Sequence, residues 1–370
     1  MAIDLPLQAP SAAGLIWRVT RSESATPDAE REEILADPGF GQHFTDHMVD
    51  LCWSVKGGWH RPQVEPYGSI PLDPAAAVLH YSQEIFEGLK AYRHADGSIW
   101  TFRPDRNAAR MQRSADRLAL PELPADIYIA SLRQLIAVDA DWVPSAPETS
   151  LYLRPFMFAK EAFLGVRAAQ KVGYYLIASP AGAYFPGGVQ PVNIWLSTQY
   201  ARAGKGGTGA AKTGGNYASS LLPQAEAYEK GCQQVLFLDG EYIEELGGMN
   251  LVLVTRDGRL LTPQSDSILE GITLASILEL AKDRGLTVEQ RRLSINEWRE
   301  GAASGEIVGA FACGTAAVVV PIGKLLADDF EIVHEGPDAT ELAMSLREEL
   351  TGIQYGRVED RHGWLLRLDA

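Results

Sequence analysis

The segment Ala210-Ala211-Lys212-Thr213-Gly214-Gly215-Asn216-Tyr217 places one lysine among small residues. Small neighbours let a planar ligand approach the backbone closely, and they remove side chains that would compete for the amine. Further along, Glu245 lies in Glu244-Glu245-Leu246-Gly247-Gly248-Met249-Asn250, next to a second pair of glycines. The two segments together indicate an amine that can bond covalently to a carbonyl and a carboxylate that can bind a nitrogen heterocycle.

The local sequence around Lys212 leaves two other interpretations open. Most lysines in loops are simply solvated. In addition, Gly206-Gly-Thr-Gly-Ala-Ala-Lys212-Thr213 differs from the phosphate loop G-x-x-x-x-G-K-[ST] only at Ala211, and 235–239 resembles a strand ending in a magnesium-binding aspartate. The alternative from another class is therefore a P-loop-like nucleotide hydrolase.

The surroundings of Lys212 count against a phosphate loop. Such a loop follows a strand directly and opens a helix at its lysine, but Gln199-Tyr-Ala-Arg-Ala203 intervenes and Gly214-Gly215 is expected to break that helix. Asp239-Gly240 is better explained as a hairpin turn. The local sequence therefore leaves two interpretations of Lys212: a solvated loop lysine, or a covalently reacting amine, which is the chemistry of pyridoxal phosphate.

Composition limits the class of protein. A chain of 370 residues is expected to form two domains. A formal charge of −15 argues against nucleic acid or an anionic membrane as a partner, so any bound phosphate needs a locally basic pocket. Cys52, Cys232 and Cys313 fit neither a disulfide framework nor a zinc site, so we predict no metal. The first residues show no secretory signal, and we expect a cytoplasmic protein.

The pattern of elements predicts an α+β to α/β fold with two domains. We expect an N-terminal arm at 1–35, loosely attached, a smaller α/β domain at 36–181, an interdomain loop at 182–191, and a larger cofactor-binding domain at 192–370. Predicted strands are 49–55, 150–158, 173–179 and 192–197, with hairpins around Asp96-Gly97, Asp239-Gly240 and Asp257-Gly258. Predicted helices are 107–118, 125–138, 217–230, 273–283, 296–304 and 339–351.

Six segments of the chain carry a resemblance to a known family. They are Phe40-Gly-Gln-His-Phe-Thr-Asp-His-Met48, His80-Tyr-Ser-Gln-Glu-Ile-Phe-Glu-Gly-Leu-Lys90, Ser150-Leu-Tyr-Leu-Arg-Pro155, Gly182-Ala-Tyr-Phe-Pro-Gly-Gly188, Lys212-Thr-Gly-Gly-Asn-Tyr217 and Phe311-Ala-Cys-Gly-Thr-Ala316. Together they resemble the branched-chain amino acid aminotransferases, which belong to the class IV, fold type IV pyridoxal-phosphate enzymes. The likeness extends from Phe40 to the C-terminal end.

The resemblance implies a role for each residue that would contact the cofactor pyridoxal 5'-phosphate. Lys212 would form the Schiff base and later move a proton between the substrate Cα and the cofactor C4′. Glu245 would keep the pyridine nitrogen protonated, and Glu244 would point the other way on the strand. Arg110, Gly271, Ile272, Thr273 and Thr315 would bind the phosphate, and Tyr217 the phenolic oxygen.

The resemblance also implies the substrate contacts. Arg154, beside Tyr152, would meet the distal carboxylate of glutamate or 2-oxoglutarate, and the small residues Gly248, Ala316 and Ala317 would let backbone N–H groups reach the substrate's own carboxylate. Phe40, Tyr81, Phe86 and Tyr184 would form apolar walls.

The resemblance implies reversible amino transfer between L-leucine, L-isoleucine or L-valine and 2-oxoglutarate by a ping-pong mechanism. It also implies a homodimer, in which the cofactor lies between the two domains of each chain. The fold that the resemblance implies is called D-amino acid aminotransferase-like. Two alternative activities of the same fold are those of a D-amino acid aminotransferase and of an aminodeoxychorismate lyase.

Overall fold

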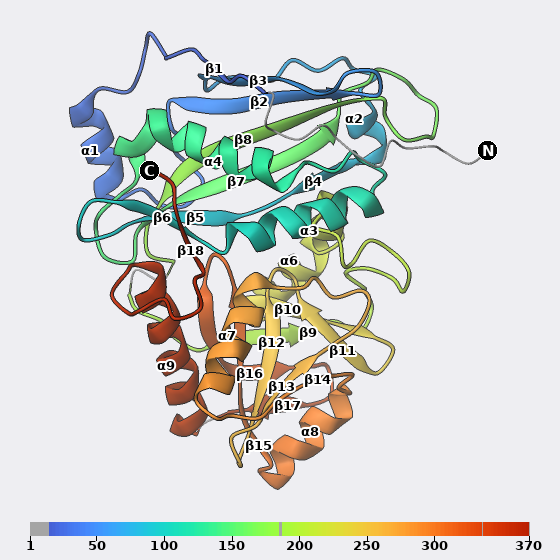
Figure 1. Ribbon diagram of the computed structural model, residues 1–370. Coiled ribbons are helices and arrows are strands. Elements are labelled where there is room, and N and C mark those ends of the chain that lie inside the picture. The colour runs from blue at the N-terminus through green and yellow to red at the C-terminus, as the bar shows by residue number, and fades with distance from the viewer. Residues whose placement is uncertain (1–14, 185–186, 335, 370) are drawn as a thin grey trace. The chain divides into compact units, whose positions relative to one another are not determined.

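The structure, a computed structural model, describes residues 15–184, 187–334 and 336–369 (Figure 1). It divides into two compact units. The first comprises the described residues up to Tyr184, together with Ala211–Gly214 and those from Gln354 onward. The second comprises the described residues of 185–210 and Gly215–Ile353.

The first unit is a sheet with helices on one face. Its strands are β1 (Arg18–Val19), β2 (His47–Ser54), β3 (Gly58–Pro66), β4 (Glu84–Phe86), β5 (Leu89–Arg93), β6 (Ile99–Phe102), β7 (Ser150–Ala159), β8 (Lys171–Ala181) and β18 (Leu365–Arg367). Its helices are α1 (Asp28–Ala36), α2 (Ala77–Tyr81), α3 (Pro104–Arg117), α4 (Ala125–Asp139) and the 3-10 helix η2 (Ala140–Trp142). The strand order is β1-β3-β2-β8-β7-β5-β6-β18, and β4 pairs with β7.

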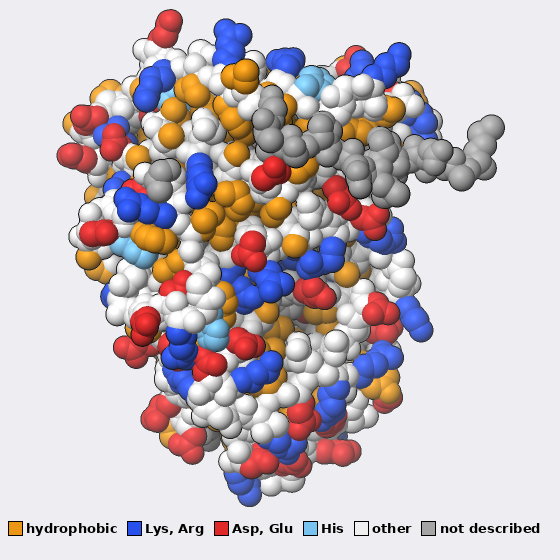
Figure 2. Space-filling view, viewed as in Figure 1, with side chains coloured by type: hydrophobic (Ala, Val, Ile, Leu, Met, Phe, Trp, Pro, Cys, Tyr) orange, Lys and Arg blue, Asp and Glu red, His pale blue; other side chains and the backbone are white. Residues whose placement is uncertain are grey.

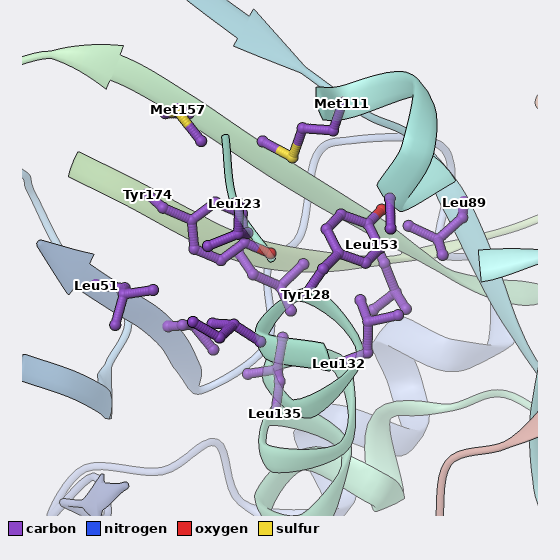
Figure 3. Close-up of a cluster of buried hydrophobic side chains, with 14 of the residues drawn as sticks. Leu51, Leu89, Met111, Leu123, Tyr128, Leu132, Leu135, Leu153, Met157 and Tyr174 are labelled. Atoms are coloured by element: carbon purple, nitrogen blue, oxygen red, sulfur yellow. The ribbon is translucent and has the colours of Figure 1, made fainter. Parts of the chain in front are cut away.

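Helices α3 and α4 pack on this sheet and form its core. The predicted inward face of α4 is confirmed for Leu132, Leu135 and Ile136, which are fully buried, whereas Ile129 is only partly buried. Figure 3 shows side chains of α4 meeting Leu51 of β2 and Tyr174 of β8. Each such leucine contributes about 1.5–3 kcal/mol relative to an exposed position.

Alternation along β7 directs the candidate site residues away from this core. Leu151, Leu153 and Met157 are buried, while Tyr152 and Arg154 between them are only partly buried. Because successive side chains of a strand point to opposite faces, Tyr152 and Arg154 lie on the face of the sheet opposite to the helices.

The second unit contains a mixed sheet. Its strands are β9 (Val192–Leu196), β10 (Gln234–Asp239), β11 (Tyr242–Leu246), β12 (Asn250–Thr255), β13 (Leu260–Pro263), β14 (Val288–Arg291), β15 (Ile307–Gly314), β16 (Val318–Leu326) and β17 (Glu331–Val333). Its helices are α5 (Gly214–Ala218), α6 (Leu221–Glu229), α7 (Ile272–Asp283), α8 (Ile295–Ser304) and α9 (Pro337–Gln354). The strand order is β11-β10-β9-β16-β15-β12-β13-β14, and β17 pairs with β16.

Local turn chemistry predicted the hairpins correctly. Gly97, Gly240 and Gly258 have positive φ values of 85°, 63° and 82° and join β5 to β6, β10 to β11 and β12 to β13. Glycine adopts this conformation without a Cβ penalty, which explains the Asp-Gly pairs.

Amphipathic periodicity also located most helices. Leu274, Ile277, Leu278 and Ala281 of α7 are all buried, as their spacing predicts. The expected helix 217–230 is instead divided into α5 and α6, and α5 begins at Gly214. The expectation that Gly214-Gly215 prevents a helix there was therefore wrong for a short helix.

The domain limits differ from the predicted ones in three places. The strand β18 pairs antiparallel with β6, so the C-terminal residues belong to the first unit (Figure 1). Ala211–Gly214 also belongs to the first unit, which holds more of the chain than the second and is not the smaller one. The chain leaves the first unit after Tyr184, inside the predicted loop 182–191.

The described part of the N-terminal arm is attached to the first unit. β1 pairs with β3, and Thr26 donates from its backbone N–H and its hydroxyl to Asp46 Oδ1, each at 2.8 Å. A loosely attached arm is therefore the wrong description of residues 15–35, because the β1–β3 pairing and the hydrogen bonds of Thr26 to Asp46 hold them. Residues 1–14 lie outside the described part of the chain.

The surface carries mixed charge. On the face shown in Figure 2, acidic and basic side chains are interspersed. Of the helices in the described residues, none is both long and apolar enough to cross a membrane.

Candidate functional site

Lys212 is attached to the first unit through its backbone. Its N–H donates to Ser114 Oγ of α3 at 2.9 Å, and its carbonyl accepts from the Phe86 N–H of β4 at 3.0 Å. The lysine therefore lies against the edge of β4, on a short segment of the chain that the first unit holds.

The Lys212 amine has a lowered pKa. Burial is the main cause, and the positive charge of Arg110 adds to it, so that the pKa falls from 10.5 to about 8. Glu87 and Tyr152 act in the opposite direction, and Arg154 lowers it further. Nζ lies 4.6 Å from the centre of the Phe86 ring. An amine with this pKa is partly neutral near pH 7, as a nucleophile must be.

Arg110 is held by a buried carboxylate. Its Nε and Nη2 donate to the two oxygens of Glu87, each at 2.8 Å, and the Glu87 side chain is fully buried. Asn107, one helical turn before Arg110, donates to Glu87 Oε2 at 2.7 Å. The predicted phosphate-binding arginine is thus near Lys212, but part of its guanidinium fork binds Glu87.

Aromatic rings enclose Arg154 next to Lys212. The Arg154 guanidinium lies 4.8 Å from the Phe86 ring centre and 5.2 Å from that of Tyr152, and Nη2 donates to the Tyr152 hydroxyl at 3.0 Å. Phe40 packs edge-on against Tyr152 at 5.1 Å. Among the described residues, nothing accepts a hydrogen bond from the buried Arg154 Nε.

Gly88 makes this arrangement possible. A Cβ at this position would lie 2.0 Å from the Tyr152 hydroxyl oxygen. Only glycine leaves the space that the tyrosine occupies.

The two remaining predicted wall residues have other surroundings. Tyr81 donates its hydroxyl to the Leu164 carbonyl at 2.5 Å and contacts the His80 ring. Tyr184 lies at the point where the chain leaves the first unit, and 46% of it is exposed. The structure brings Phe40, Phe86, Tyr152 and Arg154 together in one cluster, and Tyr81 contacts a different loop.

In the second unit, Glu245 pairs with an arginine that sequence reasoning missed. Arg202 Nη2 lies 2.5 Å from Glu245 Oε1, and the Leu269 N–H donates to the same oxygen at 2.8 Å. Both charged side chains are buried.

Glu244 and Glu245 both bind the segment 265–269, contrary to the expectation of opposite directions. Glu244 accepts from the hydroxyls of Ser265 and Ser267. The pairing of β10 with β11 is irregular between Leu236 and Leu238 of β10. Over this stretch β11 has one residue more than β10, which is a β-bulge. Such a bulge interrupts the alternation of side chains, which is the physical reason for the difference.

The start of α7 has the geometry of an anion site. Gly271 is its N-cap residue with extended backbone, and no side chain caps the first N–H groups in the described contacts. A Cβ on Gly271 would lie 1.9 Å from Asn250 Oδ1. Ile272 and Thr273 form the first turn, where unpaired N–H groups and the helix dipole favour negative charge.

The hairpin between β15 and β16 contains Thr315, Ala316 and Ala317. Val318 has a φ of 64°, and Arg347 Nη1 donates to the Ala317 carbonyl at 2.5 Å, which fixes the turn. A Cβ on Gly314 would lie 3.5 Å from the Gly248 carbonyl oxygen, so Gly248 is next to this turn. Tyr217 lies on α5 in the same unit.

Sequence reasoning missed the residues that support the site. Glu84 and Glu87 lie inside a motif that was quoted, Ser114 follows Arg110 by one helical turn, and Arg202 lies in a stretch regarded only as an insertion. The helical spacing of Asn107, Arg110 and Ser114 is the signal that could have identified Ser114, and Asn107 with it.

The phosphate-loop alternative is not supported by the fold. β9 ends at Leu196, well before the glycines, and Asp239-Gly240 forms the hairpin turn between β10 and β11. A strand does end at Asp239, as the interpretation needs, but it leads into a hairpin, and within the described residues no strand comes directly before the glycines.

The fold and the site define a class of protein. The family described as amino-transferase class IV matches residues 84–325, and the chain belongs to this family. The chain is 56% identical to the branched-chain-amino-acid aminotransferase of Mycolicibacterium smegmatis, over 96% of this chain and 99% of that protein. It is 44% identical to branched-chain-amino-acid aminotransferase 2 of Bacillus subtilis over 95% of this chain and 97% of that protein.

Solved structures of the same class superpose on it. The branched-chain amino acid aminotransferase of Escherichia coli has a TM-score of 0.70 at 29% identity, over 86% of this chain and 99% of that one. The T.th. branched-chain amino acid aminotransferase with pyridoxamine 5'-phosphate has a TM-score of 0.70 at 28% identity and the same coverage.

Proposed function

We propose that this aminotransferase exchanges the amino group of L-leucine, L-isoleucine or L-valine with 2-oxoglutarate in two half-reactions, with pyridoxal 5'-phosphate as cofactor. The observation that carries the proposal is the Lys212 amine, whose pKa is lowered to about 8 beside Arg110, Phe86 and Arg154. Relatives named as branched-chain aminotransferases supply the substrate class.

The donor groups of the chain fit this cofactor. When bound, pyridoxal phosphate accepts the electrons left at the substrate Cα after deprotonation. Lys212 would hold the cofactor covalently in the resting enzyme and then carry the Cα proton. Glu245 would accept a hydrogen bond from the ring nitrogen, and Tyr217 would donate to the phenolic oxygen.

The phosphate needs local positive charge and N–H donors in a chain whose net charge is −15. Arg110 supplies charge, and we propose that the first turn of α7 (Gly271, Ile272 and Thr273) and the Thr315 hydroxyl supply donors. Since Glu87 takes two of the Arg110 donors, the α7 terminus is expected to carry a large share of the binding.

Substrate selection depends on one cationic and several apolar groups. Arg154, between two rings, would bind the distal carboxylate of 2-oxoglutarate, and its buried Nε without an acceptor among the described residues supports this role. Leucine would meet the rings of Phe40, Phe86 and Tyr152, with Tyr81 and Tyr184 as further predicted walls. The small Gly248, Ala316 and Ala317 would expose backbone N–H groups to the substrate's own carboxylate.

Two alternatives of the same fold differ in the stereochemistry or the reaction. A D-amino acid aminotransferase would use D-leucine, and an aminodeoxychorismate lyase would release pyruvate. Purified protein is assayed with L- and D-leucine and 2-oxoglutarate. Glutamate formed from L-leucine alone supports the proposal, and activity restricted to the D isomer overturns it.

The cofactor itself is tested by a visible spectrum and by borohydride reduction. We expect an absorption band in the wild-type protein and a phosphopyridoxyl group on the Lys212 peptide after reduction. Lys205→Ala, which removes an exposed lysine from the same glycine-rich segment, is the control and keeps the band. A reduced adduct on Lys205 would contradict the assignment. The homodimer and the cytoplasmic location stay predictions.

A further inference from the structure

The segment that carries Lys212 is bound to β4 by more than its backbone. The described contacts of Lys212–Gly214 include four hydrogen bonds to β4 and α3 of the same unit. Phe86 and Ser114 make two of them, as described above. The Thr213 hydroxyl donates to Glu84 Oε1 at 3.1 Å, and the Gly214 N–H donates to the same oxygen. One carboxylate oxygen thus receives two of the four.

Glu84 lies where it can fix both ends of this contact. It is on β4, two residues before Phe86, so the two side chains share one face of the strand. The Phe86 N–H binds the Lys212 carbonyl, and its ring lies under the Lys212 amine. The Thr213 side chain is buried, so its hydroxyl has no access to bulk water in place of Glu84.

The chain on both sides of this segment belongs to the second unit. Among the hydrogen bonds of the described residues, those to Glu84 hold Thr213 and Gly214 to β4, while Phe86 and Ser114 hold the Lys212 backbone. The contacts of Thr213 and Gly214 therefore add to those of the Lys212 backbone in fixing the segment that carries the amine.

We propose that Glu84 is a positioning residue that fixes Lys212 on β4, so that its amine meets the carbonyl carbon of the cofactor. This inference rests on the proposed function. Glu84 contacts Thr213 and Gly214, not the amine. Besides burial, the groups that act on the Lys212 amine by charge are Arg110, Glu87, Tyr152 and Arg154, and Glu84 acts through hydrogen bonds.

The test separates covalent from non-covalent binding of the cofactor. Dissociation constants of the apoprotein are measured for pyridoxal phosphate and for 4-deoxypyridoxine 5'-phosphate, which keeps the ring and phosphate but lacks the aldehyde. Glu84→Leu removes the acceptor, and Glu84→Gln keeps one. Glu65→Leu is the matched control, because Glu65 is a partly buried glutamate of β3 in the same sheet.

Glu84→Leu is expected to weaken pyridoxal phosphate relative to the deoxy compound by about 10- to 100-fold, as misplacement of a reacting group does. Glu84→Gln and Glu65→Leu keep the wild-type ratio. Thr213→Val removes one donor to Glu84, and it should change the ratio of the two dissociation constants in the same direction by a smaller amount. This variant tests the proposal even if Glu84→Leu does not fold.

Each other outcome overturns the role of Glu84. Equal weakening of both compounds means a general loss of the site, and an unchanged ratio in Glu84→Leu or Thr213→Val means that the contact is not needed. A Glu84→Gln variant as defective as Glu84→Leu means that charge is responsible. A wild-type protein that binds neither compound overturns the proposed function and, with it, this role.

Discussion

Arg202 and Glu245 form a buried ion pair, in which Nη2 lies 2.5 Å from Oε1 and each side chain is only 6% exposed. The same nitrogen donates to the Gly209 and Ser267 carbonyls at 2.7 and 2.9 Å. One guanidinium therefore joins the carboxylate to the glycine-rich segment before Ala211 and to the segment that leads to α7. A carboxylate fixed in this way has a defined direction, which the partner of a ring nitrogen needs, and a counter-charge that offsets the cost of its burial.

Removal of Arg202 is expected to destabilise the apoprotein strongly. Arg202→Met leaves Glu245 buried without its counter-charge and should lower the free energy of unfolding by about 3–5 kcal/mol. Urea denaturation followed by circular dichroism measures this. Arg292→Met, which breaks an exposed ion pair with Asp239, should change it by less than about 1 kcal/mol. Equal losses of unfolding free energy in the two variants would show that the buried pair stabilises the protein no more than the exposed pair does.

The Lys212 amine is expected to react at unusually low pH. Burial and Arg110 disfavour the ammonium form, so Nζ loses its proton as the pH rises through about 8. The rate of acetylation of Lys212 in the apoprotein should be half-maximal near pH 8, against about 10.4 for a model lysine peptide in the same reaction. Mass spectrometry of the Lys212 peptide gives the rate. A midpoint equal to that of the model peptide would contradict the lowered pKa.

Arg110 and Glu87 are expected to shift this midpoint in opposite directions. Arg110→Gln removes a positive charge and raises the pKa of Lys212, while Glu87→Gln removes a negative charge and lowers it. Each shift should be on the order of one pKa unit. The acetylation midpoint measures both, and Glu65→Gln should leave it unchanged. Shifts in the same direction would show that loss of packing, not charge, governs the amine.

Arg154 is expected to act on only one of the two half-reactions. Arg154→Gln removes the cation that would meet the distal carboxylate, so kcat/KM for 2-oxoglutarate should fall by about 10- to 100-fold. The half-reaction with L-leucine, which has no second carboxylate, should keep its rate. Single-turnover measurements separate the two. Arg167→Gln, at an exposed ion pair with Glu161, is the control, and an equal loss in both half-reactions would argue against a carboxylate contact.

Several parts of the fold could be predicted because their causes are local. The spacing of Leu274, Ile277 and Leu278 gives a helix with one apolar face, and Asp-Gly pairs give hairpins whose glycines have positive φ. The alternation along β7 likewise predicts that Tyr152 and Arg154 share a face, and the structure shows both at one cluster.

Residue types and their spacing were enough to predict most of the elements and the side chains that can do chemistry, since turns and periodicity act within a few neighbours. The groups that support Lys212 and Glu245 became visible only in the folded chain. Glu84 and Thr213 are 129 positions apart, and a bulge in β11 directs Glu244 and Glu245 to the same segment. Pairing of β18 with β6 likewise brings the end of the chain to the first unit. Such contacts depend on packing between distant segments, and no local pattern records them.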